Sequence, residues 1–195
     1  MLMSITARVQ ELCQEKLLFL RQFLRHPGQI GSVTPSSSYL ARAMANAIPW
    51  ERVSSVAELG AGTGPITSVL RDRLRPGAKL VLFEKEPLLR RELESRFPEL
   101  ACYPDVLQLY DAIRKEGIVQ ADCIVSGLPF ANFPRSLRDR ILHQLDLSLK
   151  PGGTFVAFQY SLQMREQFER MFELRAIRFV PLNVPPAFVY VCVKK

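Results

Sequence analysis

The sequence predicts an α/β fold built on a seven-stranded, mostly parallel sheet with helices on both faces. From Val53 to about Phe172, short apolar runs alternate with segments of helical periodicity. Such alternation requires right-handed crossovers between parallel strands, with both faces of the sheet covered. After it come two apolar runs separated by the turn-prone PPA at 185–187. This pair predicts a terminal hairpin, so the last strand should run antiparallel to the others.

Each element follows from its own pattern. Apolar residues at three- and four-residue spacing from Ser4 to about Arg25 predict an amphipathic helix, and a second helix should run from about Ser36 to Ile48. The seven strands are expected, in chain order, in VSSVAEL, KLVLFEK, ACYP, ADCIVSG, GGTFVAFQY, AIRFVPLNV and FVYVCVKK. The helices between them should begin near Pro65, Pro87, Val106, Pro134 and Leu162. Pro181, Pro185 and Pro186 favour an edge position for one strand of the hairpin.

Bulk properties restrict the possible functions. The 195 residues, of which 48% are hydrophobic, suffice for one domain with a full core. Four cysteines lie far apart without a C-x-x-C pair, which indicates reduced thiols and a cytosolic setting, and the two histidines have no partner at metal-ligand spacing. The net charge of +7 indicates an anionic partner, for which nucleic acid and acidic lipid qualify equally. No segment has the pattern of a secretory signal or a membrane span.

A glycine-rich turn is the first candidate binding site. In VAELGAGTGPITSVL, three glycines, Gly60, Gly62 and Gly64, stand between the first strand and a helix. Glycines there let the backbone approach a ligand closely, so a nucleotide-like ligand is expected. Pro65 occupies the position where the dinucleotide fingerprint has glycine, which makes NAD the weaker interpretation. Glu58 suits a ligand with an ammonium group, such as the methionine tail of S-adenosylmethionine.

The motif ELGAGTG, with Glu84 at the end of the second strand, resembles the class I S-adenosylmethionine-dependent methyltransferases. The resemblance implies that Glu84 accepts hydrogen bonds from the ribose and that Asp105 lies by the adenine, although Pro104 stands where many members have glycine. The segment 29–36 is expected to cover the cofactor; an ordinary linker is the alternative. The complete set of expected cofactor contacts is Gly31, Ser32, Thr34, Glu58, Gly60, Ala61, Gly62, Gly64, Glu84, Lys85, Asp105, Val106 and Ser126.

The loop SGLPF, residues 126–130, follows the fourth predicted strand and should meet the transferred methyl group, because ligands of such sheets lie over the carboxyl ends of the strands. The Ser126 hydroxyl and backbone carbonyls are expected to orient an acceptor amine, and Phe130 to face the cation that grows on its nitrogen. The alternative is that Phe130 and Phe133 fill the core. The predicted catalytic residues are Ser126, Gly127, Leu128, Pro129, Phe130 and Tyr160.

Two families resemble the chain in this loop. Leu128-Pro129-Phe130 is similar to the N-L-P-Y/F element of adenine amino methyltransferases, but Gly127 stands where those enzymes have a polar residue. GSVTPSSSYLARAMA, ELGAGTGPIT, LVLFEKEP and SGLPF, in this order, resemble the bacterial phospholipid N-methyltransferases over nearly the whole sequence. That resemblance implies methylation of phosphatidylethanolamine toward phosphatidylcholine, with S-adenosylmethionine as cofactor. The expected substrate contacts are Tyr39, Phe130, Arg135, Arg138 and Tyr160, with a solvated helix face as the alternative for both arginines.

Residues 1–35 are expected to form the amphipathic helix and the covering loop, and residues 36–195 the methyltransferase domain. The charges in the first helix exclude a membrane span. The helix then lies in an anionic membrane interface or packs on its own domain or on a second chain, and the resemblance favours reversible contact with the cytoplasmic face of the cell membrane. Oligomeric state stays open, and nucleic acid is not expected as a partner. The rival functions are an RNA adenine N6-methyltransferase and a non-catalytic module that binds S-adenosylmethionine and membranes.

Overall fold

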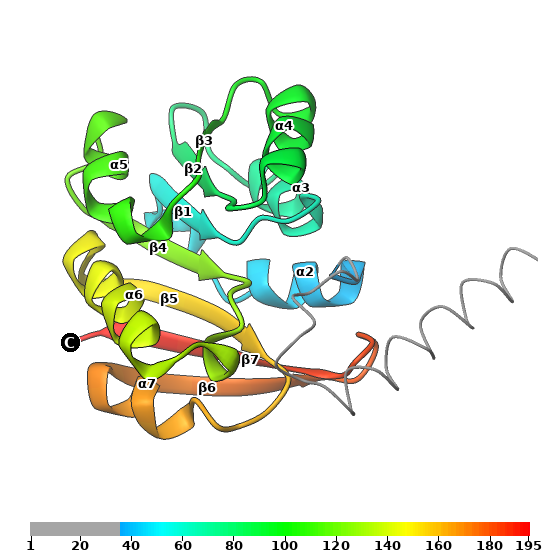
Figure 1. Ribbon diagram of the computed structural model, residues 1–195, viewed down its shortest axis with the longest axis vertical. Helices are drawn as coiled ribbons and strands as arrows, with labels where there is room; N and C mark the ends of the chain where they lie inside the picture. The colour runs from blue at the N-terminus through cyan, green and yellow to red at the C-terminus, as the bar shows by residue number, and fades with distance from the viewer. Residues whose placement is uncertain (1–35) are drawn as a thin grey trace, which may run out of the picture. The chain divides into compact units, whose positions relative to one another are not determined.

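The computed structural model describes residues 36–195, which form a three-layer α/β unit (Figure 1). Its single sheet has the strand order β3-β2-β1-β4-β5-β7-β6. The strands are β1 (Ser55–Leu59), β2 (Lys79–Phe83), β3 (Ala101–Tyr103), β4 (Ala121–Ser126), β5 (Leu149–Gln159), β6 (Phe172–Val180) and β7 (Ala187–Lys194). The pairs from β3 to β5 are parallel, and β7 runs antiparallel to both β5 and β6. This confirms the predicted seven-stranded sheet, the antiparallel last strand and the edge position of β6.

Helices cover both faces of the sheet because its central strands are apolar on both sides. Every residue of β1 and β4 is buried. One face carries α2 (Ser38–Ala45), α3 (Pro65–Arg71) and α4 (Pro87–Arg96), whose Leu40, Ile66 and Leu93 join one core cluster. The other carries α5 (Leu109–Lys115), α6 (Arg135–Ser148) and α7 (Arg165–Met171), with Leu109, Ile141 and Phe168 in a second cluster. Three short 3₁₀ turns complete the unit: η1 (Trp50–Arg52), η2 (Val106–Gln108) and η3 (Phe130–Asn132).

The switch in strand order lies between β1 and β4. These strands are neighbours, with Leu59 opposite Ser126, although β2 and β3 separate them in the sequence. The loops that follow β1 and β4 therefore meet at the carboxyl edge of the sheet, where ligands of doubly wound folds bind. The fold thus brings the glycine turn and the SGLPF loop together, as the sequence predicted.

Several element boundaries differ from the predictions, and two of the differences have a local cause. The second helix begins later than expected because Ser37 caps it, its Oγ accepting the Leu40 N–H at 3.2 Å. The last helix ends at Met171 because the segment from Phe172 already pairs with β7, where Leu174 lies opposite Cys192. Within the described residues no helix is long and apolar enough to cross a membrane. The predicted amphipathic helix and covering loop fall on residues 1–35, outside this range.

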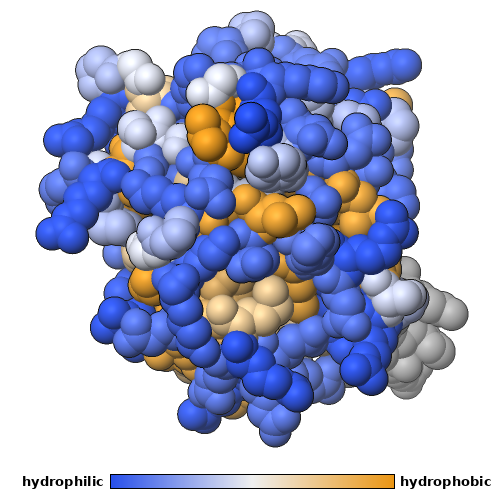
Figure 2. All heavy atoms as spheres, turned by 90° about the vertical axis from the view of Figure 1, so that its left-hand side faces the viewer, coloured by the Kyte–Doolittle hydropathy of each residue, from blue (hydrophilic) through white to orange (hydrophobic). Residues whose placement is uncertain are grey.

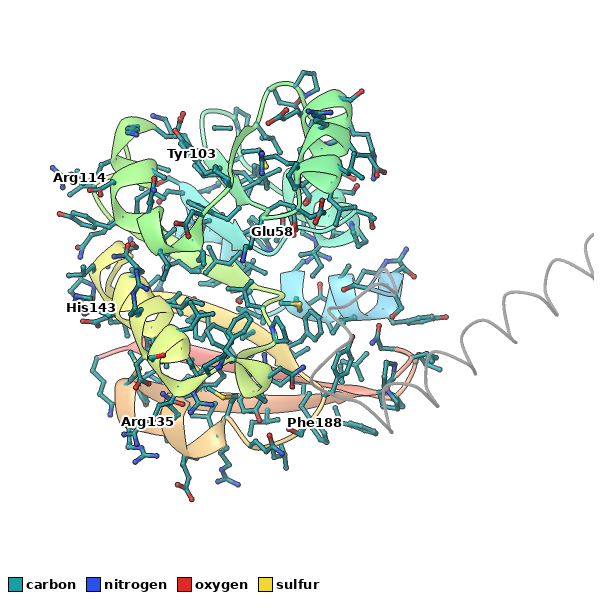
Figure 3. The ribbon with its side chains drawn as sticks, in the orientation of Figure 1. Glu58, Tyr103, Arg114, Arg135, His143 and Phe188 are labelled. Carbon is teal, nitrogen blue, oxygen red and sulfur yellow. The ribbon has the colours of Figure 1, made fainter. Side chains whose placement is uncertain are left out.

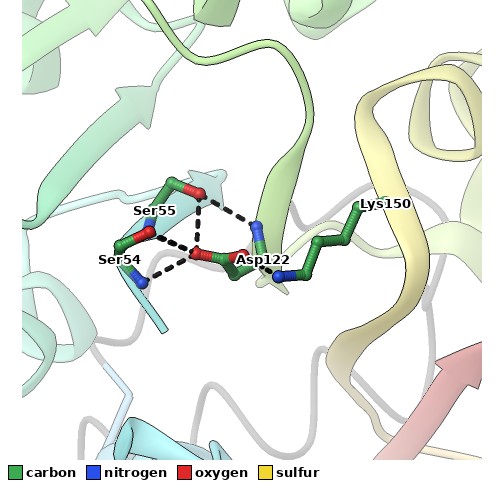
Figure 4. A network of polar contacts seen from close by, with 4 residues as sticks. All are labelled: Ser54, Ser55, Asp122 and Lys150. Carbon is green, nitrogen blue, oxygen red and sulfur yellow. Dashed lines mark hydrogen bonds and ion pairs between the residues drawn. The ribbon is translucent and has the colours of Figure 1, made fainter. Parts of the chain in front are cut away.

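A buried carboxylate joins the amino ends of three strands (Figure 4). Asp122 Oδ2 accepts hydrogen bonds from the backbone N–H groups of Ser54 and Ser55, at 2.7 and 2.9 Å, and from both serine hydroxyls. Its other oxygen forms an ion pair with Lys150 of β5. Burial acts against ionisation, but the hydrogen bonds from Lys150, Ser54 and Ser55 outweigh it and lower the pKa of Asp122 to about 2.

Replacing Asp122 with asparagine is expected to lower the free energy of unfolding by about 2 kcal/mol at pH 7, the scale of one charge-assisted hydrogen bond. Because the folded-state pKa lies below the ordinary 3.8, the carboxylate contributes stability above about pH 4 and loses it as pH falls toward 2. Urea unfolding at pH 7 and pH 3 measures both effects. Asp72→Asn is the control, since its partner Arg71 and Asp72 itself are exposed and such pairs contribute less than about 1 kcal/mol. Equal losses in the two variants would contradict this role.

Candidate active site

The glycine turn between β1 and α3 is tied to the end of β2. The backbone N–H groups of Gly60 and Ala61 both donate to the Phe83 carbonyl, at 2.8 and 3.1 Å. All three glycines of the turn have positive φ, a region that other residues adopt with strain. At Gly64 a β-carbon would lie 2.9 Å from the Phe97 ring, whereas at Gly62 it would meet nothing within 4 Å. The backbone at Gly62 therefore borders open space.

Glu84, directly after β2, faces this turn. Its Oε2 accepts the Gly62 N–H at 2.8 Å, and its Oε1 accepts the Glu86 N–H at 2.9 Å. A carboxylate oxygen has lone pairs for more than one donor, so both oxygens can accept further hydrogen bonds from ligand hydroxyls. The structure thus brings Glu84 to the glycine turn, with its side chain already oriented by the backbone.

Glu58, on β1, is a buried acid beside the same turn (Figure 3). Its Oε2 accepts the Thr67 hydroxyl at 2.7 Å, while its buried Oε1 has no hydrogen-bond partner among the described residues. Burial raises the pKa of Glu58 to about 8, against the hydrogen bond from Thr67 and with help from the negative charge of Glu84. An unpartnered buried acceptor next to a backbone turn fits the ammonium of the methionine tail, which would supply both a hydrogen bond and a positive charge.

The remaining predicted cofactor residues lie at the same edge. Asp105 follows β3 and caps η2, its Oδ1 accepting the Leu107 N–H at 2.9 Å. Val106 is half-buried beside it, and Lys85 is exposed next to Glu84. The Asp105 carboxylate is thus occupied by its own backbone on one oxygen, and the predicted adenine contact stays a prediction. Gly31, Ser32 and Thr34 lie outside the described residues.

The SGLPF loop lies directly against the glycine turn. The Gly127 N–H donates to the Leu59 carbonyl at 2.8 Å, and a β-carbon on Gly127 would stand 2.9 Å from the Gly60 carbonyl oxygen. Backbone packs on backbone here, which explains why glycine replaces the polar residue of the adenine methyltransferases. Ser126 is fully buried, and its hydroxyl accepts the Leu128 N–H at 3.2 Å. The prediction that this hydroxyl orients an acceptor is therefore corrected: it stabilises the loop from inside.

Gln159, the last residue of β5, is a site residue that sequence reasoning missed. Its buried side chain donates to the Leu128 carbonyl at 2.8 Å, and its Oε1 accepts the Ala131 N–H at 3.4 Å. It therefore fixes the loop from the strand next to β4. The signal was present in FQY, where a polar residue stands between two aromatic residues at the carboxyl end of a buried strand.

The carbonyls of the loop differ in their partners. Those of Leu128 and Pro129 accept the N–H groups of Phe130 and Asn132, both at 2.9 Å. The Gly127 carbonyl accepts no hydrogen bond within residues 36–195. Since Gly127 also contacts the glycine turn, its carbonyl is the loop acceptor best placed for an incoming N–H group.

Known proteins of similar sequence identify the family of the chain. No family model matches the sequence. The ornithine lipid N-methyltransferase of Singulisphaera acidiphila is 39% identical over 180 residues, which cover 90% of this chain and 94% of that protein. The chain belongs to the bacterial lipid N-methyltransferase family. It is an enzyme, an S-adenosylmethionine-dependent N-methyltransferase, as the sequence predicted.

Solved structures agree on the fold of this methyltransferase. NodS, an N-methyltransferase of Bradyrhizobium japonicum WM9 solved with S-adenosyl-L-homocysteine, superposes with a TM-score of 0.63 at 12% identity, covering 79% of this chain and 85% of that one. A TehB-like S-adenosylmethionine-dependent methyltransferase of Corynebacterium glutamicum gives 0.59 at 18% identity, covering 93% and 99%. These likenesses confirm the class I methyltransferase fold.

Phe130 of the methyltransferase occupies the core and not the pocket surface. Its side chain has no exposed area, and its ring packs edge-on against Phe133, Phe155 and Phe168 at centroid distances of 6.3, 6.3 and 5.7 Å. The prediction that Phe130 faces the substrate amine is corrected for this reason, and the core-filling alternative describes what is observed.

Phe130→Ala is accordingly expected to lower the free energy of unfolding by about 3 to 5 kcal/mol, as for other buried aromatic residues. The folded fraction should keep its affinity for S-adenosylmethionine, because the ring packs within the aromatic cluster of Phe133, Phe155 and Phe168. Urea unfolding and calorimetric titration measure the two quantities. Phe179→Ala, at a side chain that is 57% exposed, is the control and should cost less than about 1 kcal/mol. A Phe130→Ala protein that is stable but has low turnover would instead support a direct contact between Phe130 and the substrate.

The other predicted substrate residues divide into two groups. Tyr160 follows β5 at the carboxyl edge, and its ring packs edge-on against Phe158 at 5.6 Å. Tyr39, on α2, is 55% exposed. Arg135 and Arg138 instead line a groove of about 480 Å³ between α6 and α7.

The two arginines do not reach the glycine turn. Arg135 is 88% exposed and pairs with Asp139 of its own helix, at 3.6 Å. Figure 3 shows it well apart from Glu58. The phosphate contact of Arg135 or Arg138 therefore stays a prediction, and the exposure of Arg135 fits the alternative, a solvated helix face.

Proposed function

We propose that this methyltransferase transfers methyl groups to the amine of a lipid headgroup at a membrane surface, with ornithine lipid as the first candidate acceptor. The observation that carries the proposal is the 39% identity to an ornithine lipid N-methyltransferase over 90% of the chain. Phosphatidylethanolamine is the second candidate, since its headgroup offers the same kind of alkylamine and the sequence motifs resemble the phospholipid enzymes.

The proposed cofactor site consists of the glycine turn and the two acids beside it. Glu84 would accept hydrogen bonds from the ribose hydroxyls, and Glu58 would face the methionine ammonium through its unpartnered Oε1. The open space at Gly62 would let the ligand lie directly on the backbone of the turn. S-adenosylmethionine supplies a methyl group on a sulfonium sulfur. The contacts on residues 1–35 that the sequence predicts, together with Lys85, Asp105 and Val106, belong to the same proposal.

The acceptor side must first hold an uncharged amine. An alkylamine has a pKa of about 10.4, so at pH 7 loss of its proton costs roughly 4 to 5 kcal/mol. The Gly127 carbonyl would accept one N–H of the amine and thereby direct its lone pair. Gln159 and the buried Ser126 hydroxyl keep that carbonyl in place by fixing Leu128 on both sides. Tyr39 and Tyr160 remain candidates for lining the amine pocket.

The membrane part of the proposal rests on the amphipathic segment at 4–25 and the net charge of +7. A helix with an apolar stripe and basic flanks is suited to an anionic leaflet, which supports the proposal that the enzyme binds to the cytoplasmic face of the cell membrane.

One reaction set tests the function. The enzyme with methyl-labelled S-adenosylmethionine is offered vesicles containing ornithine lipid, vesicles containing phosphatidylethanolamine, and adenine-containing RNA. Label in ornithine lipid is the expected result, and label in phosphatidylethanolamine alone would make the second candidate the substrate. Methylated adenine without labelled lipid would establish the RNA enzyme. Cofactor affinity without transfer to any of the three would favour the non-catalytic module.

A further inference from the structure

Exposed apolar side chains concentrate at the carboxyl edge of the sheet. Seven large hydrophobic side chains of the described residues are exposed, and five of them lie on elements at this edge: Tyr39, Leu88, Leu162, Phe179 and Leu182. The other two, Val119 and Leu147, lie at the amino edge. Figure 2 looks onto the amino edge and shows a mostly hydrophilic surface on which apolar atoms form separate patches. The large exposed hydrophobic side chains of the described residues are thus concentrated on the side where the cofactor turn and the SGLPF loop meet.

The hairpin of β6 and β7 carries the most compact part of this surface. Phe179 and Leu182 are 57% and 60% exposed, and the ring of Phe179 packs on Phe188 with centroids 5.1 Å apart. We call Phe179, Leu182 and Phe188 the hairpin patch. Phe188 of β7 is paired with Gln159 of β5, the residue that fixes the SGLPF loop. The patch therefore lies on the strand next to the one that holds this loop. In Figure 1 the hairpin extends past the arrowheads of β4 and β5.

The tip of the hairpin is held firmly. Asn183 is buried, its Nδ2 donates to the Pro185 carbonyl at 2.7 Å, and its Oδ1 accepts the Ser37 N–H at 3.0 Å. The neighbouring Leu182 is therefore presented to the outside by a braced turn. A single exposed apolar side chain is common, but a group such as the hairpin patch indicates an interaction that the described residues do not provide.

Charge beside the patch favours an anionic partner. Arg178 precedes Phe179 on the edge strand and is exposed, and its guanidinium forms no ion pair or hydrogen bond within residues 36–195. The chain as a whole carries +7. Apolar side chains beside an unpaired arginine suit the interfacial region of an anionic bilayer.

We propose that the hairpin patch inserts into the interfacial region of an anionic bilayer and thereby turns the carboxyl edge toward the lipid. The proposal rests on the proposed function, because a lipid amine reaches the Gly127 carbonyl without leaving the bilayer only if this edge faces the membrane. It adds a second membrane contact to the N-terminal segment and gives the enzyme a defined orientation.

The full-length protein tests this with the double variant Phe179→Ser and Leu182→Ser, and with Val119→Ser as the matched control, since Val119 is 70% exposed at the opposite edge. Binding is measured by co-sedimentation with phosphatidylcholine vesicles that contain phosphatidylglycerol. The double variant is expected to bind at least about tenfold more weakly, because apolar area removed from water sets the affinity. Val119→Ser should bind like the wild type. Affinity for S-adenosylmethionine should be the same in all three proteins.

Equal binding of the double variant and the control would overturn the proposal. Leu182→Trp gives an independent measurement: brominated lipid should quench the fluorescence of the added tryptophan, and should leave that of Val119→Trp unquenched. A wild-type dimer that the double variant converts to monomer, or protection of the patch by residues 1–35 in the presence of vesicles, would assign the patch to another occupant and overturn the proposal. Vesicle binding is scored without turnover, so failure of lipid methylation would count against the proposed function alone.

Discussion

Glu84→Ala is expected to weaken the binding of S-adenosylmethionine by at least about 100-fold. The carboxylate orients the glycine turn through the Gly62 N–H and offers its remaining lone pairs to the ribose. Two charge-assisted hydrogen bonds of about 1.5 kcal/mol each account for a loss of this size. Isothermal titration of the free enzyme with S-adenosylmethionine measures it directly.

Glu86→Ala is the matched control for this variant. Glu86 is an exposed acid two residues away, and it contacts Glu84 through its backbone N–H alone. The affinity of the Glu86→Ala protein for the cofactor should therefore stay within about twofold of wild type. A folded Glu84→Ala protein that binds as tightly as the control would place the cofactor elsewhere.

Gly127→Ala is expected to reduce turnover on the lipid acceptor by at least about 100-fold. The added β-carbon would stand 2.9 Å from the Gly60 carbonyl oxygen, and neither backbone segment can yield without moving the other. Displacement of reacting groups by about 1 Å costs this much in comparable sites. Labelled methyl transfer at saturating cofactor measures the turnover.

Gly77→Ala is the control for adding a β-carbon to a glycine away from the site. A β-carbon at Gly77 would meet nothing within 4 Å, and Gly77 has positive φ, which Gly127 does not. This variant should lose about 1 kcal/mol of stability and keep its turnover. If Gly127→Ala retained full turnover, the Gly127 carbonyl would have no role in orienting the amine.

The sheet and the cofactor turn could be predicted from the sequence because both depend on local signals. Buried parallel strands need continuous apolar runs, and the turn needs glycines at positions with positive φ. The start of β6 at Phe172 could not be read this way, since FELR suits an amphipathic helix as well as an edge strand and only pairing with β7 decides between them.

The acceptor side was predicted less well because its residues act through tertiary contacts. Phe130 stands in a loop by sequence, yet η3 turns its ring into the aromatic cluster with Phe155 and Phe168. Arg135 begins the helix after the loop, yet it lies in the groove between α6 and α7. Gly127 stands where the loops of adenine methyltransferases have a polar residue. The reason is its close contact with the Gly60 carbonyl, which can be seen only in the folded structure.

A crystal structure of the enzyme with S-adenosyl-L-homocysteine tests the central claim most directly. The ribose hydroxyls should lie on Glu84, the amino group should face Glu58 Oε1, and the sulfur should point toward the Gly127 carbonyl. Density for the ligand anywhere other than the turn from Gly60 to Gly64, or a sulfur directed away from the SGLPF loop, would contradict the account.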